Sequence, residues 1–176
     1  MKILRLFSPT ILALLALACG AELEKNHSQS PIRPRGPPPG DPTFVRDAAL
    51  DVALESAAGS TRSHHVGDSC MACHQEHGPG RGRFTVAGTI HDASGRAVSA
   101  GSVSLTVPGS SGPPKRVAVD ALGNFYTTED VGLDASELTV TVEGANGAGR
   151  TAMPWPTLSG ACNHCHTGAA GVRLAP

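Results

Sequence analysis

The chain has few aromatic and few charged residues for its 176 positions. Aromatic side chains make up 3% of it and charged ones 16%, whereas glycine occurs 21 times and proline 14 times. So few aromatics leave a thin apolar core, and this much glycine and proline favours short strands and loops over a bundle of long helices. The formal net charge is −1 and there is no basic stripe, which argues against nucleic acid as a partner.

Cysteine is also scarce, and its placement is the most informative feature of the sequence. Four of the five cysteines form two copies of Cys-x-x-Cys-His, at residues 70–74 and 162–166. This motif resembles the attachment signature of c-type haem, in which two thiols bind the porphyrin and the histidine binds the iron. The resemblance implies two haem c groups, and the residues that would hold them are Cys70, Cys73, Cys162 and Cys165, with His74 and His166 as proximal iron ligands.

Other uses of paired cysteines agree less well with the spacing. A zinc site built from both pairs normally has roughly 15–20 residues between them, whereas 88 residues separate Cys73 from Cys162. Neither pair lies between a strand and a long helix, as a thioredoxin-type pair would. Plain disulfides stay open as an alternative if the chain is exported.

A six-coordinate iron needs a further ligand on the opposite face of each porphyrin. His64 and His65 precede the first motif closely enough to fold over its haem, and the sequence slightly favours His65. Met153 lies nine residues before Cys162 and is the candidate at the second haem. The alternatives are solvated loop histidines and an ordinary core methionine.

The N-terminus is typical of an exported protein. Residues 1–18 combine a positive start with an apolar run too short to span a bilayer, which indicates a signal peptide. Residues 15–20 resemble a bacterial lipoprotein box, which implies that Cys19 becomes the lipidated first residue. Ala16 departs from the usual leucine, and an Ala-x-Ala cleavage site that leaves Cys19 as a free thiol is the alternative.

The predicted anchor is followed by a spacer. Residues 19–43 are rich in proline and are expected to be an extended linker. Together with Cys19 they predict a protein of the bacterial cell envelope that is held to a membrane by lipid and faces the periplasm or the cell surface. Residues 44–83 are expected to hold a short helix, ending at Gly59, and then the first haem segment.

From Phe84 onward the apolar residues recur at every second position. The sequence predicts six short strands and therefore a mainly β fold, a small antiparallel β-sandwich over residues 84–153 flanked by two haem-binding loop or helix segments. Residues 154–176 form the second haem segment and a tail. An even number of antiparallel strands starts and ends at one end of the sandwich, which predicts that the two motifs lie side by side. The strands are expected at 84–90, 102–107, 116–120, 125–128, 138–143 and 150–153.

Two turn motifs carry a further resemblance. Asp92-x-x-Gly95 follows a Gly-x-Ile stretch, and Asp120-x-x-Gly123 is followed by Asn124-Phe125. These features are similar to the carboxypeptidase regulatory-like (transthyretin-like) β-sandwich, over about residues 84–147. The resemblance implies a non-enzymatic accessory module and says nothing about haem.

These observations predict an exported dihaem c-type cytochrome that passes single electrons between redox partner proteins. One alternative is a haem enzyme or sensor with one open iron site, similar to a peroxidase or a reductase. Another is a surface binding module with structural haems. The sequence shows no catalytic triad, phosphate-binding glycine loop or pair of carboxylates that would indicate other chemistry.

Overall fold

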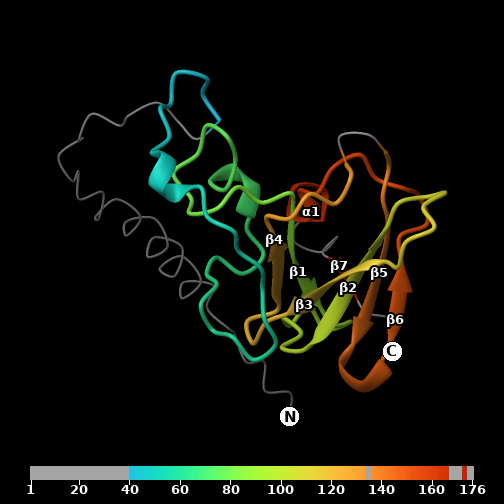
Figure 1. Ribbon diagram of the computed structural model, residues 1–176. Helices are drawn as coiled ribbons and strands as arrows, with labels where there is room; N and C mark the ends of the chain where they lie inside the picture. The colour runs from blue at the N-terminus through green and yellow to red at the C-terminus, as the bar shows by residue number, and fades with distance from the viewer. Residues whose placement is uncertain (1–39, 134–135, 167–171, 174–176) are drawn as a thin grey trace, which may run out of the picture. The chain divides into compact units, whose positions relative to one another are not determined.

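Two sheets of short strands form the centre of the structure, a computed structural model that describes residues 40–133, 136–166 and 172–173 (Figure 1). These residues all belong to one unit, Gly36–Pro176. The predicted signal peptide, Cys19 and nearly all of the linker lie outside the described residues. No helix in the described part is long and apolar enough to cross a bilayer.

The first sheet has the order β4-β1-β7. Its central strand, β1 (Val86–His91), pairs antiparallel with β4 (Asn124–Thr127) and parallel with the very short β7 (Val172–Arg173). The sequence did not predict β7, which lies in the expected tail. The rest of that tail after His166 lies outside the described residues.

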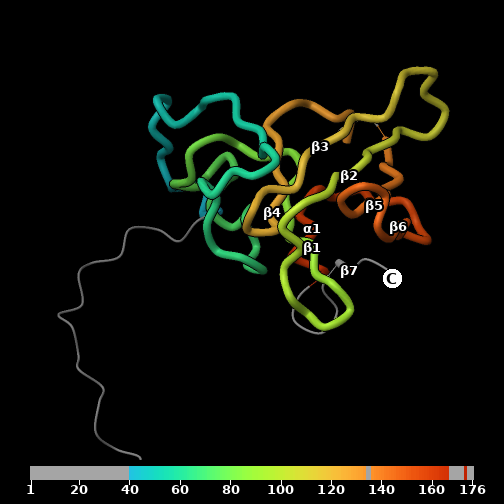
Figure 2. Tube along the Cα trace, turned by 90° about the horizontal axis from the view of Figure 1, so that it is seen from below, coloured from blue at the N-terminus to red at the C-terminus, as the bar shows by residue number. Residues whose placement is uncertain are grey.

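The second sheet has the order β3-β2-β5-β6 and is antiparallel throughout. Figure 2 shows the two sheets as two neighbouring rows, β3-β2-β5-β6 and β4-β1-β7. All six predicted strands are present, each within about two residues of its expected bounds, which confirms a mainly β fold of two sheets. The strands of this sheet are β2 (Gly101–Thr106), β3 (Lys115–Val119), β5 (Thr139–Gly144) and β6 (Arg150–Ala152).

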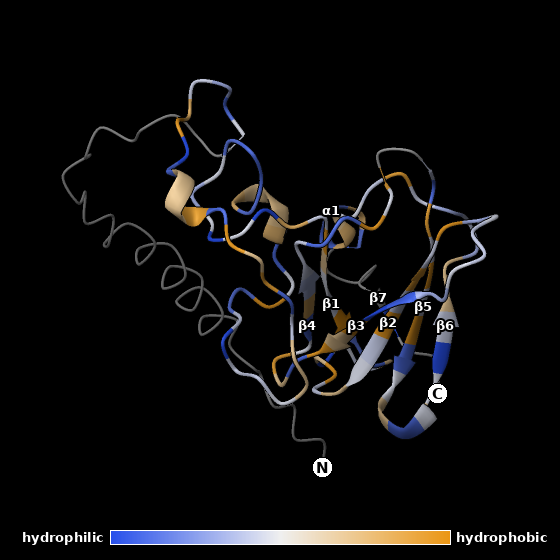
Figure 3. Cartoon of the chain, in the orientation of Figure 1, coloured by the Kyte–Doolittle hydropathy of each residue, from blue (hydrophilic) through white to orange (hydrophobic). Residues whose placement is uncertain are grey.

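The core lies between the sheets and is made mostly of valine. In the second sheet Val103 stands opposite Val117 on one side and Val142 on the other, and all three are buried. Phe125 and Ile90 close the core from the first sheet and are 1% and 0% exposed. Figure 3 shows the apolar residues along the strands, whereas the turn between β5 and β6 is polar. Alternation along β2, β3 and β5 therefore decides which of their side chains are buried, whereas β1 is buried at five consecutive positions.

The two Asp-x-x-Gly motifs form the turns that the sequence predicted. One side-chain oxygen of Asp120 accepts hydrogen bonds from the backbone nitrogens of Leu122 and Asn124, at 2.9 and 3.0 Å. Gly123 closes this turn with a φ of 85°, and Gly95 has the same φ in the turn that Asp92 begins. A positive φ costs glycine nothing, so these positions fix where the strands reverse.

The helix predicted for residues 44–59 is wrong. The structure has one 3-10 turn there, η1 (Ala48–Leu50), followed by extended backbone. The Ser56 nitrogen donates to the Tyr126 oxygen at 2.9 Å, and Leu54 and Thr128 exchange further bonds along the free edge of β4. The edge of β4 offers partners at each step, while Val45, which the helix would have buried, is 91% exposed.

Candidate functional site

The first cysteine motif forms a single tight turn. The 3-10 turn η2 (Cys70–Ala72) is closed by bonds from the nitrogens of Cys73 and His74 to the Cys70 oxygen, at 3.2 and 3.0 Å. The two cysteines therefore sit on one turn of backbone and the histidine follows directly. This is the local arrangement that attachment of two thiols to one planar group requires.

His74 is buried and its tautomer is fixed. Its ring Nδ1 lies 2.9 Å from the Arg81 carbonyl oxygen and 3.3 Å from that of Gly82. A carbonyl only accepts, so Nδ1 carries the proton and Nε2 keeps a free lone pair. Burial lowers the pKa of His74, which favours the neutral imidazole. A neutral imidazole with one nitrogen bonded to a backbone carbonyl is the form in which histidine binds a metal.

The plane of the His74 ring is also fixed. Phe84 stacks on it with a centroid distance of 4.0 Å and an angle of 5° between the rings, and Tyr126 stacks on Phe84 at 4.7 Å. Near the same ring, a Cβ added to Gly80 would lie 2.7 Å from the His74 Cγ. Packing therefore leaves the imidazole one orientation. Sequence analysis missed the roles of Phe84 and Gly80, since neither belongs to the motif.

Arg46 holds the loop that supplies the His74 hydrogen bond. Its side chain is 6% exposed. Its guanidinium donates to the Gly78 oxygen, to the Leu50 oxygen at 3.1 Å and to the Asp51 carboxylate at 2.7 Å. Gly78 lies three residues before Arg81, whose carbonyl oxygen accepts the His74 hydrogen bond. The buried Arg46 guanidinium therefore connects this loop to the segment that contains Leu50 and Asp51. No sequence signal marked Arg46, because two of its three partners are backbone oxygens.

A cavity opens beside this motif. Its volume is about 1060 Å³, at the upper end of the roughly 300–1,000 Å³ typical of ligand sites. The residues around it combine thiols, imidazoles and aromatic rings, the side chains that a large planar, partly apolar group with a metal at its centre would need. They include Cys70, Cys73, His74, His64, His65, Phe84 and Tyr126.

The structure separates the two candidate distal histidines. The ring centroids of His64 and His74 are 5.9 Å apart. An iron bonded to two opposed imidazole nitrogens at about 2 Å each would place the ring centroids roughly 6 Å apart. His65 has a side chain that is 70% exposed, and its Nδ1 pairs with the Asp68 carboxylate at 3.1 Å. The geometry therefore favours His64 as the distal ligand. The sequence had slightly favoured His65.

The second motif interrupts an edge strand. Ala161 pairs parallel with Ala87 of β1, and β7 pairs parallel with the far end of the same strand. Between them α1 (Cys162–Cys165) makes one helical turn, closed by a bond from the His166 nitrogen to the Cys162 oxygen at 2.9 Å. Thiols and histidine are again placed on a single turn.

The two thiols of the second motif differ in environment. Cys165 is exposed, whereas Cys162 is half-buried and packs against the sandwich core. Burial raises the pKa of the Cys162 thiol to about 12. His166 is half-buried. Met153 packs against the core, and its role as an iron ligand stays a prediction.

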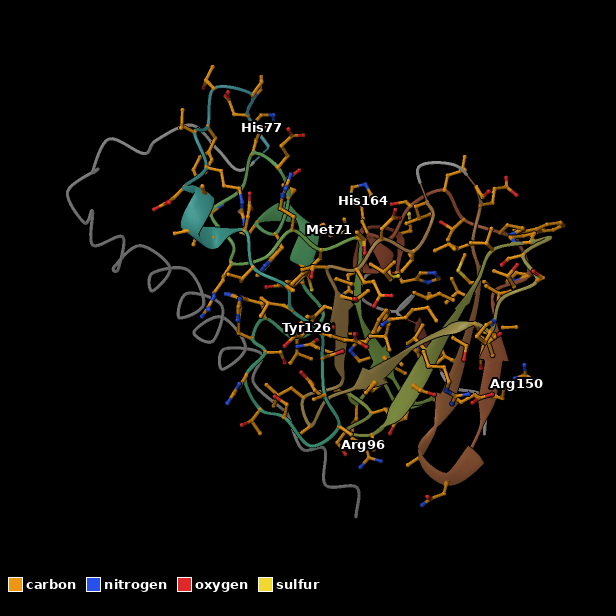
Figure 4. All side chains as sticks on the ribbon, viewed as in Figure 1. Met71, His77, Arg96, Tyr126, Arg150 and His164 are labelled. Atoms are coloured by element: carbon orange, nitrogen blue, oxygen red, sulfur yellow. The ribbon has the colours of Figure 1, made fainter. Side chains whose placement is uncertain are left out.

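The two motifs lie side by side. The Asn163 side-chain nitrogen, inside the second motif, donates to the backbone oxygen of Asp68, two residues before the first, at 2.8 Å. Figure 4 shows Met71 and His164, one from each motif, at the same end of the sheets. The arrangement agrees with the expectation from six antiparallel strands.

The four described cysteines are free thiols. Within the described residues, no group of three or more histidine, cysteine or acidic side chains is placed to hold one metal ion.

No family model, curated protein or solved structure matches the chain. The resemblances to c-type haem proteins and to the carboxypeptidase regulatory-like sandwich thus rest on the quoted residues alone.

Proposed function

We propose that the chain is an exported dihaem c-type cytochrome that transfers single electrons between redox partner proteins. One observation carries the proposal. His74 Nδ1 donates a hydrogen bond to the Arg81 carbonyl oxygen, which leaves Nε2 free. The ring lies beside a cavity that both cysteines of its motif line. The geometry suits a porphyrin bound through two thioethers and one imidazole.

At the first site, Cys70 and Cys73 would bind the porphyrin covalently and His74 would bind the iron through Nε2. A haem c held in this way supplies an iron that takes up and releases one electron. The Arg81 carbonyl and the Phe84 ring keep His74 in place. His64, whose ring centroid lies 5.9 Å from that of His74, would be the second histidine to hold the iron, and this supports electron transfer over chemistry at an open metal.

At the second site, Cys162, Cys165 and His166 would hold the other haem, with Met153 as its candidate distal ligand. Cys162 packs inward in the folded chain, and its raised pKa disfavours the reactive thiolate. We therefore expect the haem to be attached at this motif before α1 packs against β1.

The proposal places the protein in the cell envelope. The signal peptide would direct export, and a lipid on Cys19 would anchor the chain to a membrane through the proline-rich linker. The sandwich would then present both haems to partner proteins. Mass analysis of the mature N-terminus, beside a Cys19→Ala variant, tests the lipid independently of the haems.

The decisive experiment is the intact mass and the pyridine haemochrome spectrum of the chain exported from a host with a c-type maturation system. We expect two covalent haems per chain. The Cys70→Ser/Cys73→Ser and Cys162→Ser/Cys165→Ser variants should each lose one. Absence of covalent haem, with disulfides or zinc in its place, would overturn the proposal.

Carbon monoxide separates electron transfer from the alternative of an open iron site. The reduced wild-type protein should show no spectral change, because two protein side chains would hold each iron and leave no open position. Binding of carbon monoxide to either iron would favour an enzyme or a sensor.

A further inference from the structure

Asn163 occupies the first variable position of the second motif, where the attachment chemistry makes no demand on the side chain. It is nevertheless 2% exposed, whereas His164 at the next position is exposed and projects away from the sheets (Figure 4). A buried amide needs partners for its donor and its acceptor. Those partners lie outside its own motif.

Asn163 binds the segment that leads into the first motif. Its Nδ2 donates to the Asp68 backbone oxygen at 2.8 Å and to the Thr89 hydroxyl at 3.0 Å. Its Oδ1 accepts from the Thr89 backbone nitrogen at 2.9 Å. The Asp68 carbonyl only accepts and the Thr89 nitrogen only donates, so the two ends of the amide are not interchangeable here.

The network continues to the backbone of His64. The Thr89 hydroxyl donates to Asn124 Oδ1 at 2.6 Å, and Asn124 Nδ2 donates to the Ser63 hydroxyl at 3.0 Å and to the His64 backbone oxygen at 3.2 Å. The Gly67 nitrogen donates to the Thr89 hydroxyl at 2.9 Å. Thr89 and Asn124 are 0% and 1% exposed. Three buried side chains, Asn163, Thr89 and Asn124, thus bind four residues of the loop 63–68.

This loop has little else to hold it. Residues 61–66 have no helix or strand, and His65 adopts a φ of 53°, which L-residues rarely do. Outside the network, the hydrogen bonds within the loop are local, such as that from the Asp68 nitrogen to the His65 oxygen at 3.1 Å. The position of His64 relative to His74 therefore depends on the buried amides behind it.

We infer that Asn163 is a positioning residue for the first haem site, which sets the distal His64 from within the second motif. The inference rests on the proposed function and couples the two sites. Docking of α1 on β1 brings Asn163 to Asp68 and Thr89, and these contacts in turn hold the loop that carries His64. The two motifs then form one unit in which the second completes the axial coordination of the first.

The test compares Asn163→Asp with wild type and with His164→Ala. Aspartate has the same shape but cannot donate to the Asp68 oxygen, whereas His164→Ala changes the neighbouring exposed position of the same turn and leaves the network intact. We expect Asn163→Asp to keep two covalent haems and, once reduced, to bind carbon monoxide at one iron per chain. His164→Ala should exclude carbon monoxide as the wild type does.

A second readout does not depend on haem. Amide hydrogen exchange in the full chain should become faster at residues 63–68 in Asn163→Asp, by about tenfold or more, because both hydrogen bonds donated by Asn163 Nδ2 are lost. It should stay unchanged in His164→Ala. Unaltered exchange at residues 63–68 in Asn163→Asp, with carbon monoxide still excluded, would overturn the inference. A chain without covalent haem would overturn the proposed function instead, and exchange would still decide the role of Asn163.

Discussion

The imidazole rings of His64 and His74 both line the cavity, with 5.9 Å between their centroids. Nothing in the covalent chain imposes this spacing, because His64 lies in an irregular loop and His74 follows a tight turn. The separation agrees with the roughly 6 Å expected for two imidazoles that share one metal ion. We therefore predict that His64 is the histidine that completes the first site.

Replacing His64 with alanine should open the first iron. We expect the reduced His64→Ala protein to bind carbon monoxide at one haem per chain. Among the described residues, no other imidazole ring has its centroid within this distance of the His74 ring. His65→Ala is the matched control and should exclude the ligand as the wild type does. If His65→Ala opens the iron and His64→Ala does not, the assignment of the distal ligand is wrong.

Gly160 should be intolerant of a side chain. A Cβ at this position would lie 1.8 Å from the Thr85 backbone oxygen and 2.9 Å from the Val86 Cα. Because backbone atoms of the first sheet cannot move aside, Gly160→Ala should lower the free energy of unfolding by about 1–3 kcal/mol. Urea denaturation measures the change.

Gly112→Ala is the control for this prediction. Its added Cβ would approach only the Ser110 hydroxyl, at 3.5 Å, which is ordinary contact. We expect its unfolding midpoint to match that of the wild type. Equal stability of the two variants would show that the approach of residue 160 to β1 is looser than the structure has it.

Arg46 should matter more for stability than its neighbour Arg83. Arg46→Met keeps the apolar stem but removes the donors to the Gly78 and Leu50 oxygens, and we expect a loss of about 2–3 kcal/mol. Arg83 is 54% exposed and pairs only with Asp51, at 3.3 Å, among the described residues, so Arg83→Ala should change little. Thermal unfolding of both variants compares them, and a larger loss in Arg83→Ala would contradict the prediction.

Alkaline pH should destabilise the haem-free chain through Cys162. The folded pKa of this thiol is about 12, above its ordinary value of 9.0, because burial disfavours the thiolate. The stabilising contribution is therefore complete below pH 9 and is lost as the pH rises from 9 towards 12, where the unfolded chain ionises first. Unfolding titrations of wild type and Cys162→Ala measure this, and parallel pH profiles would count against it.

The same burial should separate the two thiols of the second motif by reactivity. In the folded haem-free chain at pH 8 we expect iodoacetamide to label the exposed Cys165 well before Cys162. In urea the two rates should become equal. Peptide mass mapping follows each site. Equal rates in the folded chain would contradict the expectation that haem is attached at this motif before α1 packs against β1.

Features that depend on neighbouring residues could be predicted from the amino-acid sequence. Apolar alternation predicted every strand of the sandwich except β7, and the aspartates and glycines of the two Asp-x-x-Gly turns predicted where the chain reverses, since strand burial and turn geometry are local properties. The spacing of the cysteines and of the histidine after them likewise predicted a compact turn at each motif.

Contacts between distant parts of the chain could not be predicted in this way and are seen only in the fold. Residues 44–59 have helical periodicity, yet the free edge of β4 binds them as extended backbone. His64 and His65 are adjacent in sequence, and only the fold turns one towards His74 and the other towards Asp68. Asn163 finds its partner Asp68 across 95 residues of chain. Such pairings depend on the docking of distant segments, which no periodicity or motif encodes.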